Sequence, residues 1–142
     1  MSGKKILVVD DNAIIVKTLA WKLLGAGYKV LSAADASTAI KIVHAEDPDL
    51  LILDINLPAD VASGGTVSWD AFAILQWLKR LNKDWCKPVV IITGEESPQG
   101  EAKAQAAGAV AFFRKPVNHE ELLKAIRQAL GEEEQALPPP SA

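Results

Sequence analysis

Residues 50–54 read LLILD, four large apolar residues followed at once by an aspartate. Four similar short apolar runs occur along the chain: KILVV (5–9), KVLSA (29–33), VVIIT (89–93) and AVAFF (109–113). Apolar runs without regular polar alternation are typical of strands covered on both faces, as in a parallel sheet between two layers of helices. The five runs therefore predict five parallel strands.

Segments with a helical period lie between these runs, at roughly 13–24, 37–45, 70–81, 99–107 and 119–130. The last segment has the clearest limits: Asn118 stands at the N-cap position, Glu121 at the capping-box position, and Gly131 where a helix stops. In segment 70–81 the buried stripe leaves Trp77 to one side, so we expect its ring to be half exposed. This alternation predicts an α/β fold with an open, doubly wound sheet.

The composition is that of one compact domain of ordinary size. Of the 142 residues, 49% are hydrophobic and 23% are charged, which is enough to bury a core. A net charge of −3, from 15 Lys and Arg against 18 Asp and Glu, argues against direct binding of nucleic acid or of an anionic membrane. The single cysteine, Cys86, forms no internal disulfide, and no apolar stretch has the length of a signal peptide or membrane span. These features predict a cytoplasmic protein.

Two segments depart from the regular alternation. The connection after the central strand contains Pro58, Gly64 and Gly65 and exceeds the ~2–6 residues usual for a βα loop, so we expect an insertion at about 59–69. The end of the chain, 132–142, is acidic and then proline-rich, a composition that does not pack a core. We therefore expect one folded domain over 1–131 and a flexible tail or linker over 132–142.

Polar residues follow the apolar runs at the points where the predicted strands end. Asp10 and Asp11 follow the first run and Asp54 the third, Thr93 ends the fourth, and Lys115 comes shortly after the fifth. Each alone is explained as a helix cap, a turn residue or a surface charge. In a sheet of order 2-1-3-4-5, however, the carboxyl ends of strands one, three, four and five meet at one edge. Three carboxylates are therefore expected to converge there.

Three carboxylates in one shallow crevice repel each other unless a cation lies among them. Mg²⁺ prefers hard oxygen ligands and is commonly held by one or two carboxylates together with a phosphate oxygen. With Asp10 and Asp11 holding the ion, Asp54 is the natural nucleophile and would form an acyl phosphate. The Thr93 hydroxyl and the Lys115 ammonium would then bind phosphoryl oxygens, contacts that we expect only after phosphorylation.

Four motifs occur in a fixed order: VVDDN (8–12), LILDINLP (51–58), IITG (91–94) and FFRKP (112–116). Taken together they resemble the receiver domain of two-component response regulators, including the chemotaxis type, over roughly residues 4–130. The resemblance implies a single flavodoxin-like (βα)5 domain with a five-stranded parallel sheet of order 2-1-3-4-5 and helices on both faces.

The resemblance also assigns the metal ligands and the phosphoacceptor. It implies that Asp54 accepts a phosphoryl group from a sensor histidine kinase or a phosphotransfer protein. Mg²⁺ would be the cofactor, bound directly by Asp11 and Asp54, by Asp10 largely through water, and by the backbone carbonyl of Asn56. Asn56 and Glu95 match positions that tune the lifetime of the acyl phosphate, and their side chains are like those of faster-decaying members.

Other positions match the phosphate-binding and switch residues of the family. Lys115 would contact the phosphoryl group and precede a cis peptide bond to Pro116. Thr93 and Phe112 would be the switch pair, the hydroxyl moving toward the phosphate and the aromatic ring turning inward. Phe112 lacks the phenol of the commoner tyrosine, so an outward-facing hydrogen bond is not available to it.

The output implied by the resemblance is a change in a protein-interaction surface on the fourth helix, fifth strand and fifth helix. Partners would be the kinase and either a downstream protein target or a C-terminal effector domain that has been lost, with no nucleic acid or membrane bound directly. The predicted fourth helix is rich in alanine, so we expect a monomer or a weak dimer. The chain would be a signalling phosphoacceptor that catalyses only its own phosphorylation and dephosphorylation, not an enzyme in the usual sense.

Three alternatives remain at this stage. A pseudo-receiver would bind partners without being phosphorylated. A phosphohydrolase of the haloacid-dehalogenase type would need an aspartate two residues after Asp10, where the chain has Asn12. A flavin-binding module would need a Ser-, Thr- or Gly-rich loop after the first strand, and DDNAII (10–15) does not provide one.

The chain departs from the family pattern in two places. Ala71 fills a position usually held by glycine. The insertion at about 59–69 would cap the site, dock a partner or be passive.

Overall fold

The computed structural model describes residues 3–54, 71–81, 87–93, 102, 104–106, 108–115 and 117–131, and within 71–81 it describes the side chains of 74–80. The expected insertion (59–69), the tail (132–142), Asn56, Glu95 and Pro116 lie outside these residues. The elements are β1 (Lys5–Val9), α1 (Ala13–Gly25), β2 (Lys29–Ala33), α2 (Ala36–Glu46), β3 (Leu50–Asp54), α3 (Ala71–Leu81), β4 (Val89–Thr93), β5 (Ala111–Arg114) and α5 (His119–Ala129).

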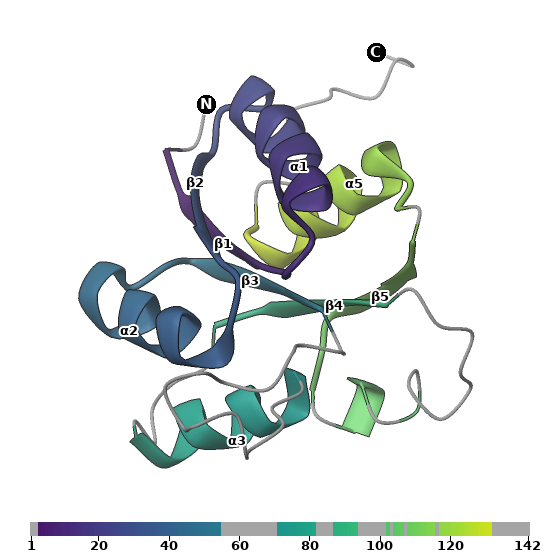
Figure 1. Cartoon of the computed structure of the whole chain (residues 1–142). Helices are drawn as coiled ribbons and strands as arrows, with labels where there is room; N and C mark the ends of the chain where they lie inside the picture. The colour runs from purple at the N-terminus through teal and green to yellow at the C-terminus, as the bar shows by residue number, and fades with distance from the viewer. Residues whose placement is uncertain are drawn as a thin grey trace.

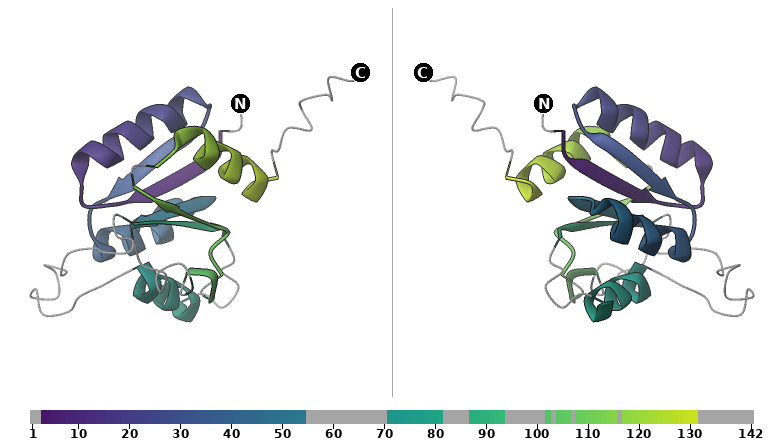
Figure 2. Two further views of the ribbon diagram at one scale, coloured as in Figure 1. Left: turned by 90° about the vertical axis from the view of Figure 1, so that its right-hand side faces the viewer. Right: turned by 90° about the vertical axis from the view of Figure 1, so that its left-hand side faces the viewer.

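The five strands form one parallel sheet of order β2-β1-β3-β4-β5, as the sequence predicts. Helices α1 and α5 lie on one face of the sheet, and α2 and α3 lie on the other (Figures 1 and 2). The strand order reverses between β1 and β3, because the chain runs from β1 outward to β2 and then returns past β1. Ligands of open α/β sheets bind at the carboxyl ends of the strands beside such a reversal.

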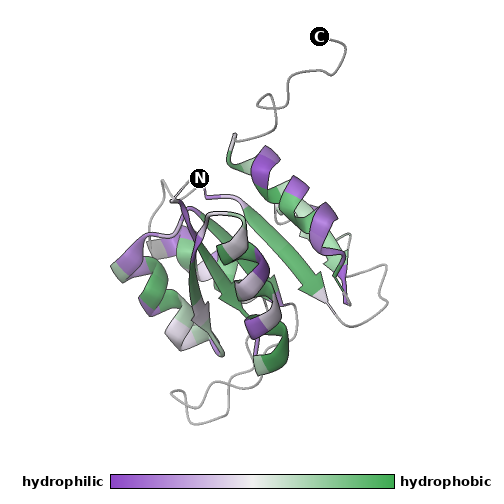
Figure 3. Cartoon of the chain, turned by 90° about the horizontal axis from the view of Figure 1, so that it is seen from above, coloured by the Kyte–Doolittle hydropathy of each residue, from purple (hydrophilic) through white to green (hydrophobic). Residues whose placement is uncertain are grey.

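The core has two layers because neighbouring residues of each strand point to opposite faces. In β1 and β3, Ile6, Val8 and Ile52 pack with the helix residues Leu19 and Leu23 of α1. The intervening strand residues pack with α2 and α3 on the other face; they include Leu7, Val9, Leu51 and Leu53. Strands therefore appear apolar almost throughout, whereas helices carry both polar and apolar residues (Figure 3).

Side chains that accept hydrogen bonds from free backbone N–H groups begin three of the helices. Asn12 caps α1, Asp35 caps α2 by accepting from the Thr38 N–H at 2.8 Å, and Asn118 caps α5. The Asn118 cap and the stop at Gly131, which has φ 73°, confirm the limits predicted for α5. These caps explain why the observed helices lie close to the predicted segments.

The fifth strand begins later than predicted, at 111 instead of 109, and ends at 114 instead of 113. The predicted fourth helix is helical at the described residues 102 and 104–106, and its end accounts for the shift. Gly108, with φ 88°, donates to the Gln105 carbonyl at 3.0 Å, and Ala109 donates to the Ala104 carbonyl at 3.0 Å. This pair of bonds is a Schellman motif, so Ala109 belongs to the helix end despite its apolar side chain.

The outer face of α3 carries a partly exposed tryptophan. Trp77 on α3 is 41% exposed, which confirms that it lies beside the buried stripe of Ile74, Leu75 and Leu78. None of the helices in the described part of the chain combines the length and the apolar character needed to span a bilayer.

Candidate functional site

Three polar side chains are buried at the carboxyl edge of the sheet. Asp10 directly follows β1 and is 1% exposed, Asp54 ends β3 and is 4% exposed, and Thr93 ends β4 and is 1% exposed. Aspartates are rarely buried unless a cation or hydrogen-bond donors compensate their charge. Buried polar and charged side chains therefore occur at the sheet edge where the sequence predicts a site.

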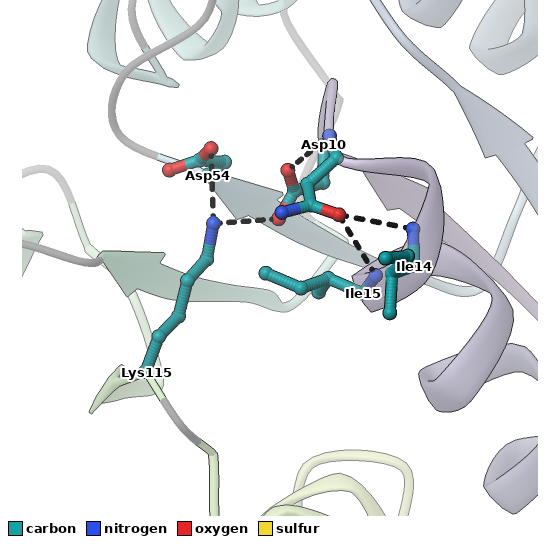
Figure 4. A network of polar contacts seen from close by, with 6 residues as sticks. Asp10, Ile14, Ile15, Asp54 and Lys115 are labelled. Atoms are coloured by element: carbon teal, nitrogen blue, oxygen red, sulfur yellow. Dashed lines mark hydrogen bonds and ion pairs between the residues drawn. The ribbon is translucent and has the colours of Figure 1, made fainter.

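Lys115 links the two buried aspartates. Its backbone N–H donates to the Thr93 carbonyl at 2.7 Å, which holds the residue beside the end of β4. Its ammonium Nζ lies 2.8 Å from Asp10 Oδ2 and 3.2 Å from Asp54 Oδ2, so it bridges side chains from β1 and β3 (Figure 4). The predicted contact of Lys115 with a phosphoryl oxygen after phosphorylation stays a prediction; in the structure the ammonium is paired with both carboxylates.

The charge state of Lys115 follows from two opposing effects. Burial of the ammonium by itself would lower its pKa, because a low-dielectric environment disfavours the charged form. The close contact with Asp10 and the negative charges of Asp54 and Asp10 outweigh that effect, so the pKa of Lys115 is raised above its ordinary value. The side chain is therefore a stable cation at neutral pH.

Asp10 is held in place by the start of α1. Its Oδ1 accepts a hydrogen bond from the Asn12 backbone N–H at 2.9 Å. The Asn12 side chain in turn accepts from the N–H groups of Ile14 at 2.9 Å and Ile15 at 3.3 Å (Figure 4). This arrangement fixes the Asp10 carboxylate relative to the first turn of the helix.

The second oxygen of Asp10 is left with capacity for a cation. Oδ2 is buried and, within the described part of the structure, has no hydrogen bond of good geometry. Its contact with Lys115 Nζ at 2.8 Å is close enough for an ion pair, and we treat it as one because the two charges are opposite and the distance is short. A buried carboxylate oxygen without an aligned donor is what a metal-binding site presents before the ion binds.

Asp10, Asp11 and Asp54 together form a group that could hold a metal ion, since one carboxylate oxygen from each lies within 4.8 Å of the others. Asp11 is exposed, whereas its two partners are buried. Among the described residues, three carboxylates against the Lys115 ammonium leave an excess of two negative charges, which a divalent cation would balance. Oxygen ligands with open positions suit a hard cation such as Mg²⁺.

The structure thus brings together Asp10, Asp11, Asp54 and Lys115, four of the residues predicted for the site. Thr93 is buried at the end of the neighbouring strand, β4. Phe112 is half-buried against the core cluster beneath α2 and α3. The predicted roles of Asn56, Glu95 and the Lys115–Pro116 peptide bond fall on residues outside those described.

The sequence alone did not predict the link between Asn12 and Asp10. The available signal was its position, directly after two aspartates and directly before a helix. In that position its backbone N–H donates to the Asp10 carboxylate, and its side-chain oxygen accepts from an N–H group of the helix.

Comparisons with known proteins agree with this geometry. Residues 6–127 match the model of the response regulator receiver domain. A CheY-like receiver domain protein from Methanospirillum hungatei is 30% identical, with a TM-score of 0.77 over 95% of this chain and 99% of that one. The chemotaxis protein CheY4 of Vibrio cholerae is 29% identical, with a TM-score of 0.77 over 91% of this chain and 100% of that one.

Among curated proteins, the alkaline phosphatase synthesis transcriptional regulatory protein PhoP of Bacillus subtilis is 30% identical over 136 residues, which is 96% of this chain and 52% of PhoP. The chain spans about half the length of several curated relatives that it matches. The fold and the site define a receiver domain of a two-component response regulator. The chain belongs to the response regulator receiver domain family, which is a family of signalling domains.

Proposed function

We propose that Asp54 is the phosphoacceptor of this domain and that Mg²⁺, held by Asp10, Asp11 and Asp54, assists the transfer. The observation that carries the proposal is the convergence of these three carboxylates within 4.8 Å, with the Lys115 ammonium against two of them. Of the three, Asp54 alone ends a strand in the middle of the sheet. Within the proposal, residues 1–131 form the receiver domain.

The chemistry is in-line displacement at phosphorus. An Asp54 carboxylate oxygen forms a bond to phosphorus while the bond between phosphorus and the donor's nitrogen or oxygen breaks, and the donor keeps the electron pair. When bound, Mg²⁺ supplies charge neutralisation for the phosphoryl oxygens. Burial of Asp54 limits access of water to the resulting acyl phosphate, whose hydrolysis ends the signal.

Lys115 would change partners during this reaction. In the structure its ammonium is paired with Asp10 and Asp54. Phosphorylation removes the charge of the Asp54 carboxylate and adds negative phosphoryl oxygens nearby. The ammonium would then move from the carboxylate to a phosphoryl oxygen. The Lys115 backbone bond to the Thr93 carbonyl keeps these two residues together while the side chain moves.

The remaining assignments rest on the family resemblance together with position. Thr93 would donate its hydroxyl to a phosphoryl oxygen, and Phe112, half-buried two residues before Arg114 at the end of β5, would respond by turning inward. Asn56 would contribute its backbone carbonyl to the ion, and Asn56 and Glu95 would tune the acyl-phosphate lifetime. The phosphoryl donor would be a histidine kinase or phosphotransfer protein, and the output would be a change in a protein-interaction surface on the fourth helix, β5 and α5.

A phosphohydrolase role is disfavoured by Asn12. Enzymes of that type use an acidic group two residues after the nucleophile of the first strand. Here the Asn12 side chain is an amide whose oxygen accepts the Ile14 and Ile15 N–H groups of the helix.

The direct experiment is incubation with Mg²⁺ and a small acyl-phosphate donor, followed by intact-mass measurement. We expect one phosphate-sized increase in the wild-type chain, and no increase in Asp54→Asn or when a chelator replaces Mg²⁺. Asp47→Asn is the matched control, because Asp47 is exposed, and asparagine tolerates its φ of 48°. An increase that persists in Asp54→Asn would move the phosphoacceptor elsewhere, and no increase even with a cognate kinase would indicate a pseudo-receiver.

A further inference from the structure

Helix α1 carries a stripe of exposed apolar residues on its solvent face, beside the exposed Lys17 and Lys22. Ile14 is 77% exposed, Trp21 78% and Leu24 57%, at the spacing of one stripe along the helix. The Thr18 hydroxyl, which lies between the first two, donates to the Ile14 carbonyl at 2.9 Å and so presents less polar character to solvent. Exposed apolar side chains that lie together on one surface are typical of a binding site, and Trp21 and Leu24 are neighbours on this stripe.

A groove lies beside Trp21, between the second half of α1 and α5. It has a volume of about 440 Å³ and is lined by Trp21, Lys22, Gly25, Ala26, Leu123 and Arg127. Gly25 and Ala26 leave room where larger side chains would fill the space. Among the described residues, the lining includes two cationic side chains and no carboxylate, so the groove favours an occupant that is both acidic and apolar.

The sequence that follows α5 has this composition. Residues 132–142, which lie outside the described part of the structure, read EEEQALPPPSA. Gly131, with φ 73°, turns the chain away from the α5 axis one helical turn after Arg127. Six extended residues span up to ~20 Å, so Glu132 to Leu137 are long enough to cross the groove.

We propose that the segment 132–140 docks in this groove of its own chain. Glu132, Glu133 and Glu134 pair with Lys22 and Arg127, and the following Leu-Pro-Pro-Pro stretch packs on the Trp21 ring. Proline-rich segments in an extended helix bind aromatic-lined grooves in this manner, at low entropic cost. Because the segment is joined directly to α5, its effective concentration at the groove is on the order of millimolar, so weak contacts suffice. The proposal does not depend on phosphorylation.

The test is paramagnetic broadening in the full chain. A nitroxide is attached at Ser141→Cys in a Cys86→Ser background, which removes the one native cysteine. We expect loss of the amide signals of Gly25 and Ala26 and of the Trp21 indole signal, with recovery when the nitroxide is reduced. Signals of α2, on the opposite face, are the internal reference. Groove signals no weaker than those of α2 would overturn the proposal.

Variants separate the two kinds of contact. Changing Glu132, Glu133 and Glu134 together to Gln, or raising the salt concentration to about 1 M, where the screening length is ~3 Å, should restore the groove signals. Trp21→Ala should also restore the Gly25 and Ala26 signals, whereas Trp77→Ala, on the exposed side of α3, should not. Identical broadening in Trp21→Ala would contradict a role for the ring.

A mixed sample identifies the occupant. Spin-labelled chain without isotope is mixed with isotope-labelled chain without the nitroxide. Docking within one chain predicts no broadening of the groove signals in this mixture. Broadening there would overturn the proposal in favour of a second copy as the occupant.

Discussion

Lys115 is the residue on which the charge balance of the site depends. Its ammonium contacts a carboxylate oxygen of Asp10 and one of Asp54, which come from different strands, and both aspartates are almost completely buried. Among the residues that the structure describes, this ammonium lies against both buried charges. Removing it leaves two carboxylates that repel each other in a poorly solvated place.

Lys115→Ala should therefore lower the free energy of unfolding by about 2 kcal/mol in the absence of divalent cations. The loss is smaller than the ~3–5 kcal/mol for breaking a fully buried pair, because solvent still reaches part of the Lys115 side chain. Chemical denaturation measures the difference. Lys5→Ala, which removes an exposed pair with Glu46, is the matched control and should cost at most ~1 kcal/mol. Equal losses in the two variants would contradict the account.

The raised pKa of Lys115 predicts a pH dependence at the alkaline end. A lysine whose folded-state pKa is raised contributes stability that is fully present below its unfolded pKa of about 10.4 and is lost as the pH rises through the folded value. The stability difference between wild type and Lys115→Ala should therefore be constant from neutral pH to about pH 10 and shrink above it. A difference that shrinks between pH 6 and 8 would point to another group.

Among the helices, α1 is linked to the carboxylate cluster through Asn12. The side chain caps the helix at Ile14 and Ile15, and the backbone N–H of the same residue holds Asp10. One short turn thereby fixes both the start of the helix and the direction of the Asp10 carboxylate, one of the proposed metal ligands.

Asn12→Ala should reduce the free energy of unfolding by about 1 kcal/mol, the usual value of an N-cap side chain. Asn12→Ser retains an oxygen that can accept from the same N–H groups and should lose only a fraction of this. Urea denaturation of the three proteins tests the difference. If the serine variant is as unstable as the alanine variant, the cap is not the stabilising feature of this residue.

The strands and most helix limits were predictable because apolar runs and capping residues can be recognised from residues that are close together in the sequence. Leu50 to Asp54, for example, is apolar until the sheet ends, and Asn118 begins α5 as expected. The start of β5 was not predictable from apolar character. Ala109 is part of the Schellman motif that ends the preceding helix, and Val110 is 52% exposed. The pairing of Lys115 with Asp10 depends on the reach of a long side chain across β4 and β3, which no local pattern encodes.

At the scale of the whole molecule, metal binding and folding stability are linked. The carboxylates of Asp10, Asp11 and Asp54 come together only in the folded sheet, so Mg²⁺ should bind the folded state and not the unfolded chain. At a Mg²⁺ concentration 100 times the dissociation constant, the free energy of unfolding should rise by ~2.7 kcal/mol. A chelator should reverse the gain.

The variants Asp10→Asn and Asp11→Asn should lose most of this Mg²⁺-dependent gain at matched ionic strength, whereas Asp47→Asn should keep it. Thermal or urea unfolding with and without Mg²⁺ gives the comparison. A gain of the same size in Asp10→Asn would show that the ion binds elsewhere.

The central claim is that Asp54 carries the phosphoryl group, and chemical mapping of the acyl phosphate tests it most directly. The chain is treated with Mg²⁺ and a small acyl-phosphate donor and then with borohydride, which reduces an aspartyl phosphate to homoserine. Peptide mass spectrometry locates the reduced residue. We expect homoserine at position 54 and at no other aspartate, and only when Mg²⁺ is present. Homoserine at position 10 or 11, with Asp54 intact, would contradict it.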